Sequence, residues 1–441
     1  MSLTHTFSDG QHRSPPIAGA SGNYWPAAII LAIVFVTFRP LSDPEVISGS
    51  GGGGDLVNQL GFGGLGLICL YLLIKRSSSE AISALTNPLW LMVLPVLALS
   101  VVSADLPGSA LRAVLFSFIV VLAAATAMSQ HRTMSELVSA LSFATGCTLL
   151  FCYVAVFFYP ELGVHEAEGA EAVHAGLWRG VYDHKNVATY VMGGFVLFGW
   201  FIAKNGKPGV GLAILLAASV FVLQAGSKTV MVILPASILC IAVAQWITWP
   251  FLKALTVLSP VVVLGTVTLG SVIYPPILLE IQSYFPGITY TGRTDLWTFG
   301  LDDLAQSPWF GFGFESYWRT PRVMDAVQPI DLNWDVRDAV HGHNSWLDAA
   351  LSFGIPGALL LGLVLVVMPI RDYVSIPNSG NAGKLAKLFV TLWLFTALGA
   401  NLESFFFRRA DPVWFSMLIA IVGLRLTAHI SSRHNAAPMR R

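Results

Sequence analysis

The chain has 441 residues, of which 55% are hydrophobic and 11% are charged, and its formal net charge is zero. This balance excludes the strongly basic surface expected of a nucleic-acid-binding protein. The high apolar content instead favours lipid as the solvent that surrounds most of the chain.

Apolar segments near the length needed to cross about 30 Å of hydrocarbon recur along the chain. They predict an all-α polytopic membrane protein with about twelve transmembrane helices, an even number. The predicted spans are 25–41, 56–74, 87–103, 109–128, 136–159, 186–203, 208–225, 228–247, 251–273, 345–369, 386–402 and 412–429.

Two long polar connections divide these spans. A segment over 1–24, expected to be disordered, precedes helices one to nine over 25–273, which include the first connection, 160–185. A larger loop over 274–344 precedes the last three helices over 345–429, and a tail over 430–441 follows. Lys and Arg in the short loops gather on the side of both termini, which predicts that the termini are cytoplasmic and that both connections face outward.

Ionisable side chains are almost absent from the centres of the predicted spans, where transporters keep such groups for function. Arg425, near the inner end of the last span, is expected to reach the membrane interface. The ionisable residues instead gather at one membrane surface. This favours a site at the lipid–water boundary over a path through the membrane.

Within the larger loop, the apolar spacing between Gly292 and Pro308 predicts a short helix capped by Thr291 or Thr294. Arg293 lies at its start, where the guanidinium fork and the helix dipole both attract anions. An ordinary exposed arginine is the alternative. The aromatic run over 309–318 is typical either of a sugar-stacking surface or of anchoring at the membrane interface.

His341 and His343 flank a glycine directly before a long apolar segment. An imidazole titrates near neutral pH, so either residue could accept a proton from an attacking hydroxyl. The neighbouring acids are not at zinc-ligand spacing, so we predict no metal centre.

The first connection ends in Arg179, His184, Lys185 and Asn186, and Lys228 opens a later span at the same surface. Each cation taken alone could bind lipid headgroups. Together with Arg293, however, Lys228, Arg179 and Lys185 converge on one face at helix starts or loop ends. The pattern predicts a shared anion site.

A wider pattern joins these segments. His343-Asn344 is followed by Gly354 and Gly357, and it comes after Gly292-Arg293 and Trp297. This pattern resembles the O-antigen ligase/Wzy (Wzy_C) superfamily of polysaccharide-assembly enzymes. The segment over 180–186 resembles its ExoQ-like exopolysaccharide polymerase subgroup, and the resemblance covers about 178–357.

The resemblance implies a GT-C-type membrane glycosyltransferase in the bacterial inner membrane, with short helices in a large periplasmic loop and no cofactor. Its donor would be a polyprenyl-pyrophosphate-linked oligosaccharide and its acceptor a glycan hydroxyl. A chain-length regulator and a flippase of the same pathway are expected partners. The implied site comprises His343 as catalytic residue, Arg293, Lys228, Arg179 and Lys185 around the pyrophosphate, and His341, Asn344, Asn186, His184 and Trp297 in support.

One position departs from the family pattern, which has arginine where this chain has Lys228. Lysine keeps the charge but offers no bidentate fork. The preferred interpretation is a polymerase with an inverting, metal-independent mechanism. An O-antigen ligase, which would transfer the polysaccharide to lipid A core, and a flippase or exporter of lipid-linked sugars are the alternatives.

Overall fold

The structure is a computed structural model that describes residues 23–38, 40–41, 56–167, 172–286, 290, 292–327 and 335–436. The predicted disordered segment over 1–24 therefore lies outside the described residues, except for its last two, as does the end of the predicted tail. In the described ranges the chain is helical, with an antiparallel bridge between Val164 and Trp178.

The helices have the following bounds. The longer ones are α1 (Trp25–Val36), α3 (Leu56–Arg76), α6 (Val93–Val102), α7 (Pro107–Ser129), α8 (Met134–Phe158), α10 (Lys185–Lys204), α11 (Pro208–Ala225), α12 (Lys228–Ala244), α13 (Pro250–Val267), α15 (Pro275–Tyr284), α16 (Arg293–Leu304), α18 (Ser345–Gly362), α20 (Gly380–Gly399) and α21 (Pro412–Ala436). The shorter ones are α4 (Ser79–Leu85), α5 (Pro88–Leu91), α9 (Pro160–Gly163), η1 (Ala172–His174), α14 (Leu269–Ile273), α17 (Pro321–Met324), η2 (Val336–Asp338), η3 (Leu363–Val367) and α19 (Met368–Ser375).

Each of the twelve predicted spans falls on helix. Among the described residues, nine helices are long and apolar enough to cross a membrane, or ten if Ser79–Leu85 and Pro88–Val102, bent by 57°, form one broken span. Helices α1 and α12 are apolar but have only 12 and 17 residues. The protein is thus an all-helical, multi-pass membrane protein, and the number twelve stays a prediction.

Three predicted spans contain breaks that periodicity did not indicate. The span over 87–103 is divided at Met92 into α5 and α6. The span over 251–273 is divided at Thr268 into α13 and α14. The span over 345–369 continues to Ser375 and kinks at Gly354, whose φ is 72°. A Cβ at Gly354 would lie 2.3 Å from the carbonyl oxygen of Trp309, so only glycine lets the aromatic loop approach this closely.

The transmembrane bundle has a buried centre and an exposed periphery. In their most apolar windows, α21, α20 and α10 are 83, 78 and 72% buried, whereas α13 is 17% buried. Helices α10 and α11 approach closely because their contact includes glycine: a Cβ at Gly211 would lie 2.2 Å from the backbone nitrogen of Ala203. The apolar side chains on the periphery are suited to face lipid.

The sequence predicts that Arg425 extends alone to the membrane interface. In the structure it is paired instead. Its guanidinium pairs with Asp372 at 3.0 Å and also donates to the carbonyl of Ala84. The pair joins α21 to α19, with only 7% of the Asp372 side chain exposed. A charge that is paired in this way can stay inside the bundle because its partner offsets the loss of water.

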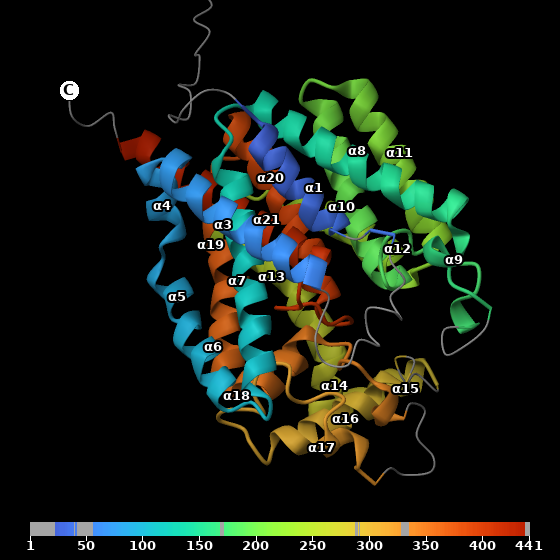
Figure 1. Ribbon diagram of the computed structural model, residues 1–441. Helices are drawn as coiled ribbons and strands as arrows, with labels where there is room; N and C mark the ends of the chain where they lie inside the picture. Colours follow the sequence, from blue (N-terminus) through green and yellow to red (C-terminus); the bar gives the residue numbers. More distant parts are fainter. Residues whose placement is uncertain are drawn as a thin grey trace, which may run out of the picture.

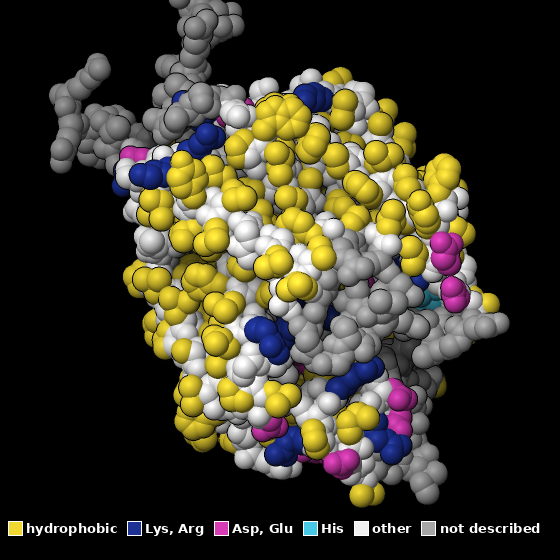
Figure 2. All heavy atoms as spheres, viewed as in Figure 1, with side chains coloured by type: hydrophobic (Ala, Val, Ile, Leu, Met, Phe, Trp, Pro, Cys, Tyr) yellow, Lys and Arg dark blue, Asp and Glu magenta, His cyan; other side chains and the backbone are white. Residues whose placement is uncertain are grey.

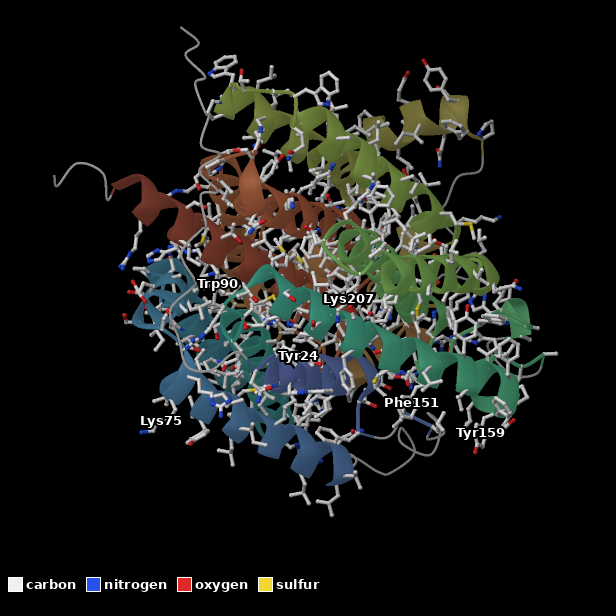
Figure 3. The ribbon with its side chains drawn as sticks, turned by 90° about the horizontal axis from the view of Figure 1, so that it is seen from above. Tyr24, Lys75, Trp90, Phe151, Tyr159 and Lys207 are labelled. Atoms are coloured by element: carbon white, nitrogen blue, oxygen red, sulfur yellow. The ribbon has the colours of Figure 1, made fainter. Side chains whose placement is uncertain are left out.

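The described parts of the large polar loop over 274–344 form a separate layer. Helices α15, α16 and α17 lie beyond one end of the bundle, and the C-terminal end of α21 lies at the opposite end (Figure 1). Figure 2 shows apolar side chains over the bundle, charged side chains gathered over this layer, and further Lys and Arg at the opposite end. Seen from above, α8 runs toward Tyr159 at one edge, while Lys75 projects from α3 at the other (Figure 3).

Candidate functional site

Four segments from distant parts of the chain meet where the layer of α15, α16 and α17 contacts the bundle. They are the start of α10, the start of α16, the stretch over 341–345 that leads into α18, and the turn over 400–411 between α20 and α21. Helix α16 also packs against α18. The helix predicted around 292–308 is thus confirmed as α16, but its N-cap is Gly292, with φ 80°, and not Thr294. Thr291 lies outside the described residues.

The carboxylate of Glu403 joins these segments. Its Oε1 accepts from Nη2 of Arg293 at 2.7 Å and from Nδ2 of Asn186 at 2.8 Å. Its Oε2 lies 3.0 Å from Nδ1 of His343. The side chains of Arg293, His343 and Glu403 are only 14 to 15% exposed. We call Glu403, Arg293, His343 and Asn186 the Glu403 cluster.

Two opposing effects set the charge of Glu403. Burial alone would raise the pKa of its carboxyl, but the charge of Arg293 and the interaction with His343 outweigh burial and hold this pKa well below its usual range. Glu403 is therefore ionised at neutral pH. The sequence places this acid in a short turn between two apolar spans, which is the one signal that could have drawn attention to it.

Two hydrogen bonds hold the backbone on the N-terminal side of His343, one to the carbonyl oxygen and one from the nitrogen of Gly342. The indole Nε1 of Trp297 donates to the carbonyl of Gly342 at 2.8 Å, and the Gly342 nitrogen donates to Asp348 at 3.0 Å. Trp297 is fully buried in α16. This explains how Trp297 supports the site, since it ties the loop that carries His343 to the helix that carries Arg293.

The backbone on the C-terminal side is held by Asn344, which is completely buried. Its side-chain oxygen accepts from the backbone nitrogens of residues 346 and 347 and so caps α18. Its side-chain nitrogen donates to the carbonyl of Asn401, and its backbone nitrogen donates to Oγ of Ser404. Between these anchors His343 has φ 48°, a left-handed conformation that L side chains rarely adopt. The imidazole is therefore positioned by its neighbours.

His341 lies directly beside His343, with the ring centroids 4.2 Å apart. Its Nδ1 accepts from the backbone nitrogen of His343 at 3.3 Å. Burial, together with the neighbouring His343 and the positive charge of Arg408, lowers the pKa of His341 well below its usual range. A neutral His341 that accepts at Nδ1 carries its proton on Nε2, so it can donate but does not add charge.

The predicted cations of the first connection have other contacts. Arg179 donates from Nε to the carbonyl of Leu162 at 2.9 Å and from Nη2 to that of Glu161 at 3.0 Å. These bonds hold the C-terminal end of α9. They engage the guanidinium with the backbone and not with the Glu403 cluster, so the role of Arg179 toward an anion stays a prediction.

His184 caps α10, because its Nδ1 accepts from the backbone nitrogen of Asn186 at 3.1 Å. The backbone nitrogen of Lys185 donates to Nε2 of His165 at 3.1 Å. Through this start of α10 the first connection places Asn186, though not Arg179, in the Glu403 cluster. Lys228 begins α12 with its side chain exposed, and in the described part of the chain no hydrogen bond or ion pair joins it to the cluster.

Comparison with known proteins gives two matches. Residues 212–362, which include Lys228, Arg293 and His343, match a family model described as O-antigen ligase. The chain is also 24% identical over 216 residues to the exopolysaccharide production protein ExoQ of Rhizobium meliloti (strain 1021). That alignment covers 47% of this chain and 42% of the relative, so it spans less than half the length of either protein. The predicted resemblance is thereby confirmed: the chain is similar to the O-antigen ligase family over residues 212–362 and to ExoQ over 216 residues.

Proposed function

We propose that this protein is a polysaccharide polymerase of the membrane. It would transfer an oligosaccharide from a polyprenyl-pyrophosphate donor to a sugar hydroxyl of an acceptor glycan. The reaction would take place on the outer side of the bacterial inner membrane and would invert the anomeric centre. The match to the O-antigen ligase family and the similarity to an exopolysaccharide production protein support this class of reaction.

The observation that carries the proposal is the Glu403 cluster. It brings together the residue predicted to act as base, His343, and the residue predicted to bind pyrophosphate, Arg293, although 50 positions separate them. Among the described residues, Nε of Arg293 is buried with no hydrogen-bond partner. A buried donor of this kind is uncommon unless a ligand completes it, which suits an incoming phosphate oxygen.

Glu403 would fix the proton of His343. At 3.0 Å, the contact between Nδ1 and the ionised carboxylate is shorter than the 3.4 Å contact between Nδ1 and Arg293. It favours the tautomer that donates from Nδ1 to Glu403. The lone pair of the neutral ring then lies on Nε2, the atom that would accept a proton.

In the proposed step the acceptor hydroxyl oxygen forms a bond to the anomeric carbon of the donor sugar. The bond between that carbon and the phosphate oxygen breaks, and the oxygen leaves with the electron pair as polyprenyl pyrophosphate. The hydroxyl proton passes to Nε2 of His343. Glu403 stabilises the resulting imidazolium, because the carboxylate already faces the other ring nitrogen.

Arg293 would stabilise the charge that develops on the departing pyrophosphate. Its guanidinium is only 14% exposed, and at such a site electrostatic interactions are stronger than in water. Lys228 and Lys185 are proposed to contribute further charge from the starts of α12 and α10. The step needs no metal, since pyrophosphate is a good leaving group whose charge these cations offset.

Transfer by the purified chain tests the proposal. The full-length protein is reconstituted into nanodiscs with lipid-linked repeat units, and the products are separated by size. Longer lipid-linked glycans are expected, and the His343→Ala variant should form none while remaining folded in the disc. The same protein is also reconstituted into vesicles. If it forms no product but moves lipid-linked sugars across the vesicle membrane, the transport alternative replaces this proposal.

An O-antigen ligase is the second candidate, because the matched family model carries that description. Both reactions use the same class of donor and differ in the acceptor. A deletion strain that accumulates single lipid-linked repeats would support the polymerase. Full-length chains left on the lipid carrier would support the ligase.

A further inference from the structure

A polar cavity lies beside the Glu403 cluster. It has a volume of about 300 Å³ and lies between the loop over 314–319, the first turns of α18 and the turn over 404–408. His341 lines it, whereas Arg293 and Asn186 do not. The cavity is at the small end of ligand sites and has room for one or two sugar rings. We call it the His341 pocket.

The structure separates the aromatic run over 309–318 into two parts. The side chains of Trp309 and Phe310 are 70 and 56% exposed and lie outside the His341 pocket, as anchoring residues would. Trp318 instead lines the pocket, and its Nε1 donates to Asp348 at 2.7 Å, which fixes the ring. A fixed indole in a pocket is a suitable surface for the apolar face of a sugar.

The charged groups of the pocket differ in their hydrogen-bond and ion-pair partners. Of its two acids, Glu315 pairs with Arg409, and Asp348 accepts from Trp318 and from the Gly342 nitrogen.

Its two cations, Arg319 and Arg408, are both exposed. Arg408 donates weakly to the carbonyl of Ser404 at 3.3 Å, and no hydrogen bond or ion pair of Arg319 is found in the described part of the chain. The pocket therefore offers two guanidinium groups to an anion, while its acids are already bonded.

We propose that the His341 pocket is the acceptor subsite and that Arg319 and Arg408 bind an anionic group on the acceptor glycan. This rests on the proposed function, in which His343 deprotonates the acceptor. A glycan in the pocket would contact His341, whose ring lies against that of His343, while Arg293 stands away from the pocket. The anomeric carbon would thus lie between the acceptor hydroxyl and the leaving pyrophosphate, as in-line displacement requires, with His343 beside the acceptor hydroxyl.

Two sources could supply the anion. One is a carboxylate on a sugar of the acceptor, and the other is the diphosphate that links a lipid-borne acceptor to its carrier. Binding is measured with soluble probes on the purified full-length chain, using methyl glucuronide, methyl glucoside and inorganic pyrophosphate. Saturation-transfer NMR reports the sugars and phosphorus line broadening reports pyrophosphate, so neither readout depends on catalysis.

The variant that removes both guanidinium groups, Arg319→Gln with Arg408→Gln, should weaken binding of the anionic probe about tenfold or more. The matched control is Arg337→Gln, an exposed arginine paired with Asp335 outside the pocket, and it should bind as the wild type does. Arg319→Lys keeps the charge and should retain much of the binding, which separates lost charge from misfolding.

Each pattern of results has a meaning. Pocket-dependent binding of the glucuronide, with weaker binding of the neutral glucoside, supports a sugar carboxylate. Pocket-dependent binding of pyrophosphate alone supports the lipid diphosphate. If the double variant binds every probe as the wild type does, the inference is wrong. Pyrophosphate binding that only Arg293→Gln removes would leave the proposed function intact while excluding the pocket.

Discussion

The sequence predicts both Arg293 and Arg179 as anion-binding cations beside polar turns at one membrane surface. In the structure their guanidinium groups have different partners. Arg293 pairs with an ionised carboxylate and keeps one buried donor without a partner. Arg179 places two donors on the backbone carbonyls of residues 161 and 162. An arginine bonded to main-chain carbonyls stabilises a loop, whereas one oriented by a carboxylate can keep a remaining donor for an anion. The comparison distinguishes an arginine of the candidate site, Arg293, from an arginine that supports the structure, Arg179.

The largest effect is expected for His343→Ala. It removes the proposed base from the Glu403 cluster, so transfer should fall by about a hundredfold to ten-thousandfold. Chain length of the product on gels is the measurement, and the amount of protein in the membrane is the control. Normal polymer from a normally inserted variant would remove His343 from the mechanism.

Arg293→Lys should be the next most severe change. A lysine keeps the charge but cannot bond Glu403 and a phosphate oxygen with a fixed fork, so we expect a loss of about tenfold to a hundredfold in kcat/KM. The companion change Arg179→Lys is matched in chemistry and should leave kcat/KM within about twofold. Equal losses in the two variants would contradict the distinction between the regions.

Glu403→Gln keeps the shape of the side chain and removes its charge. Transfer should drop by about tenfold or more, because the imidazolium formed at His343 loses its counter-charge.

The stability effect of Glu403 has a defined pH dependence. Because the folded-state pKa of Glu403 is depressed, its contribution is present above the ordinary carboxyl pKa and is lost only as the pH falls through the depressed value. The difference in stability between wild type and Glu403→Gln should stay constant from about pH 7 to about pH 5.5 and shrink only in stronger acid. Thermal unfolding at several pH values measures this, and a difference that disappears by pH 6 would contradict the assignment.

Arg179→Gln should affect stability more than transfer. Two carbonyls at the end of α9 would lose charged donors, at a cost of about 1–3 kcal/mol. A lower midpoint of thermal unfolding, or faster proteolysis of the connection over 160–185, is the expected result. Lost transfer with unchanged stability would return Arg179 to the anion site.

The smallest effect is expected for Lys228→Arg, which introduces the arginine expected from the family pattern. Its side chain is exposed at the start of α12, so we expect less than about a threefold change in kcat/KM. A tenfold gain would show that a fork at this position reaches the substrate, and so would bring Lys228 into contact with the leaving group.

The sequence indicated those parts of the site whose chemistry is visible locally. His343 and Arg293 stand out as ionisable residues beside turns in a polar loop of an apolar chain. Glu403 does not, because its role depends on a contact 110 positions away from Arg293. The same limit explains Arg179, since no neighbouring residue reveals that two main-chain carbonyls will take its donors.

For the fold, hydropathy placed helix in every predicted span, because length and apolar content are properties of a segment alone. Hydropathy did not predict the break at Thr268 or the kink at Gly354, because each lies at a single residue. The kink depends on the close approach of the carbonyl of Trp309, a tertiary contact that periodicity does not record.

The turn that supplies Glu403 lies between the last two long helices, α20 and α21. During synthesis this turn emerges after the segments that carry Asn186, Arg293 and His343, because it follows them in the chain. A nascent chain stalled before that event would contain the proposed base without its carboxylate partner. Folding of the final helical pair would therefore complete the Glu403 cluster after its other three members have been synthesised.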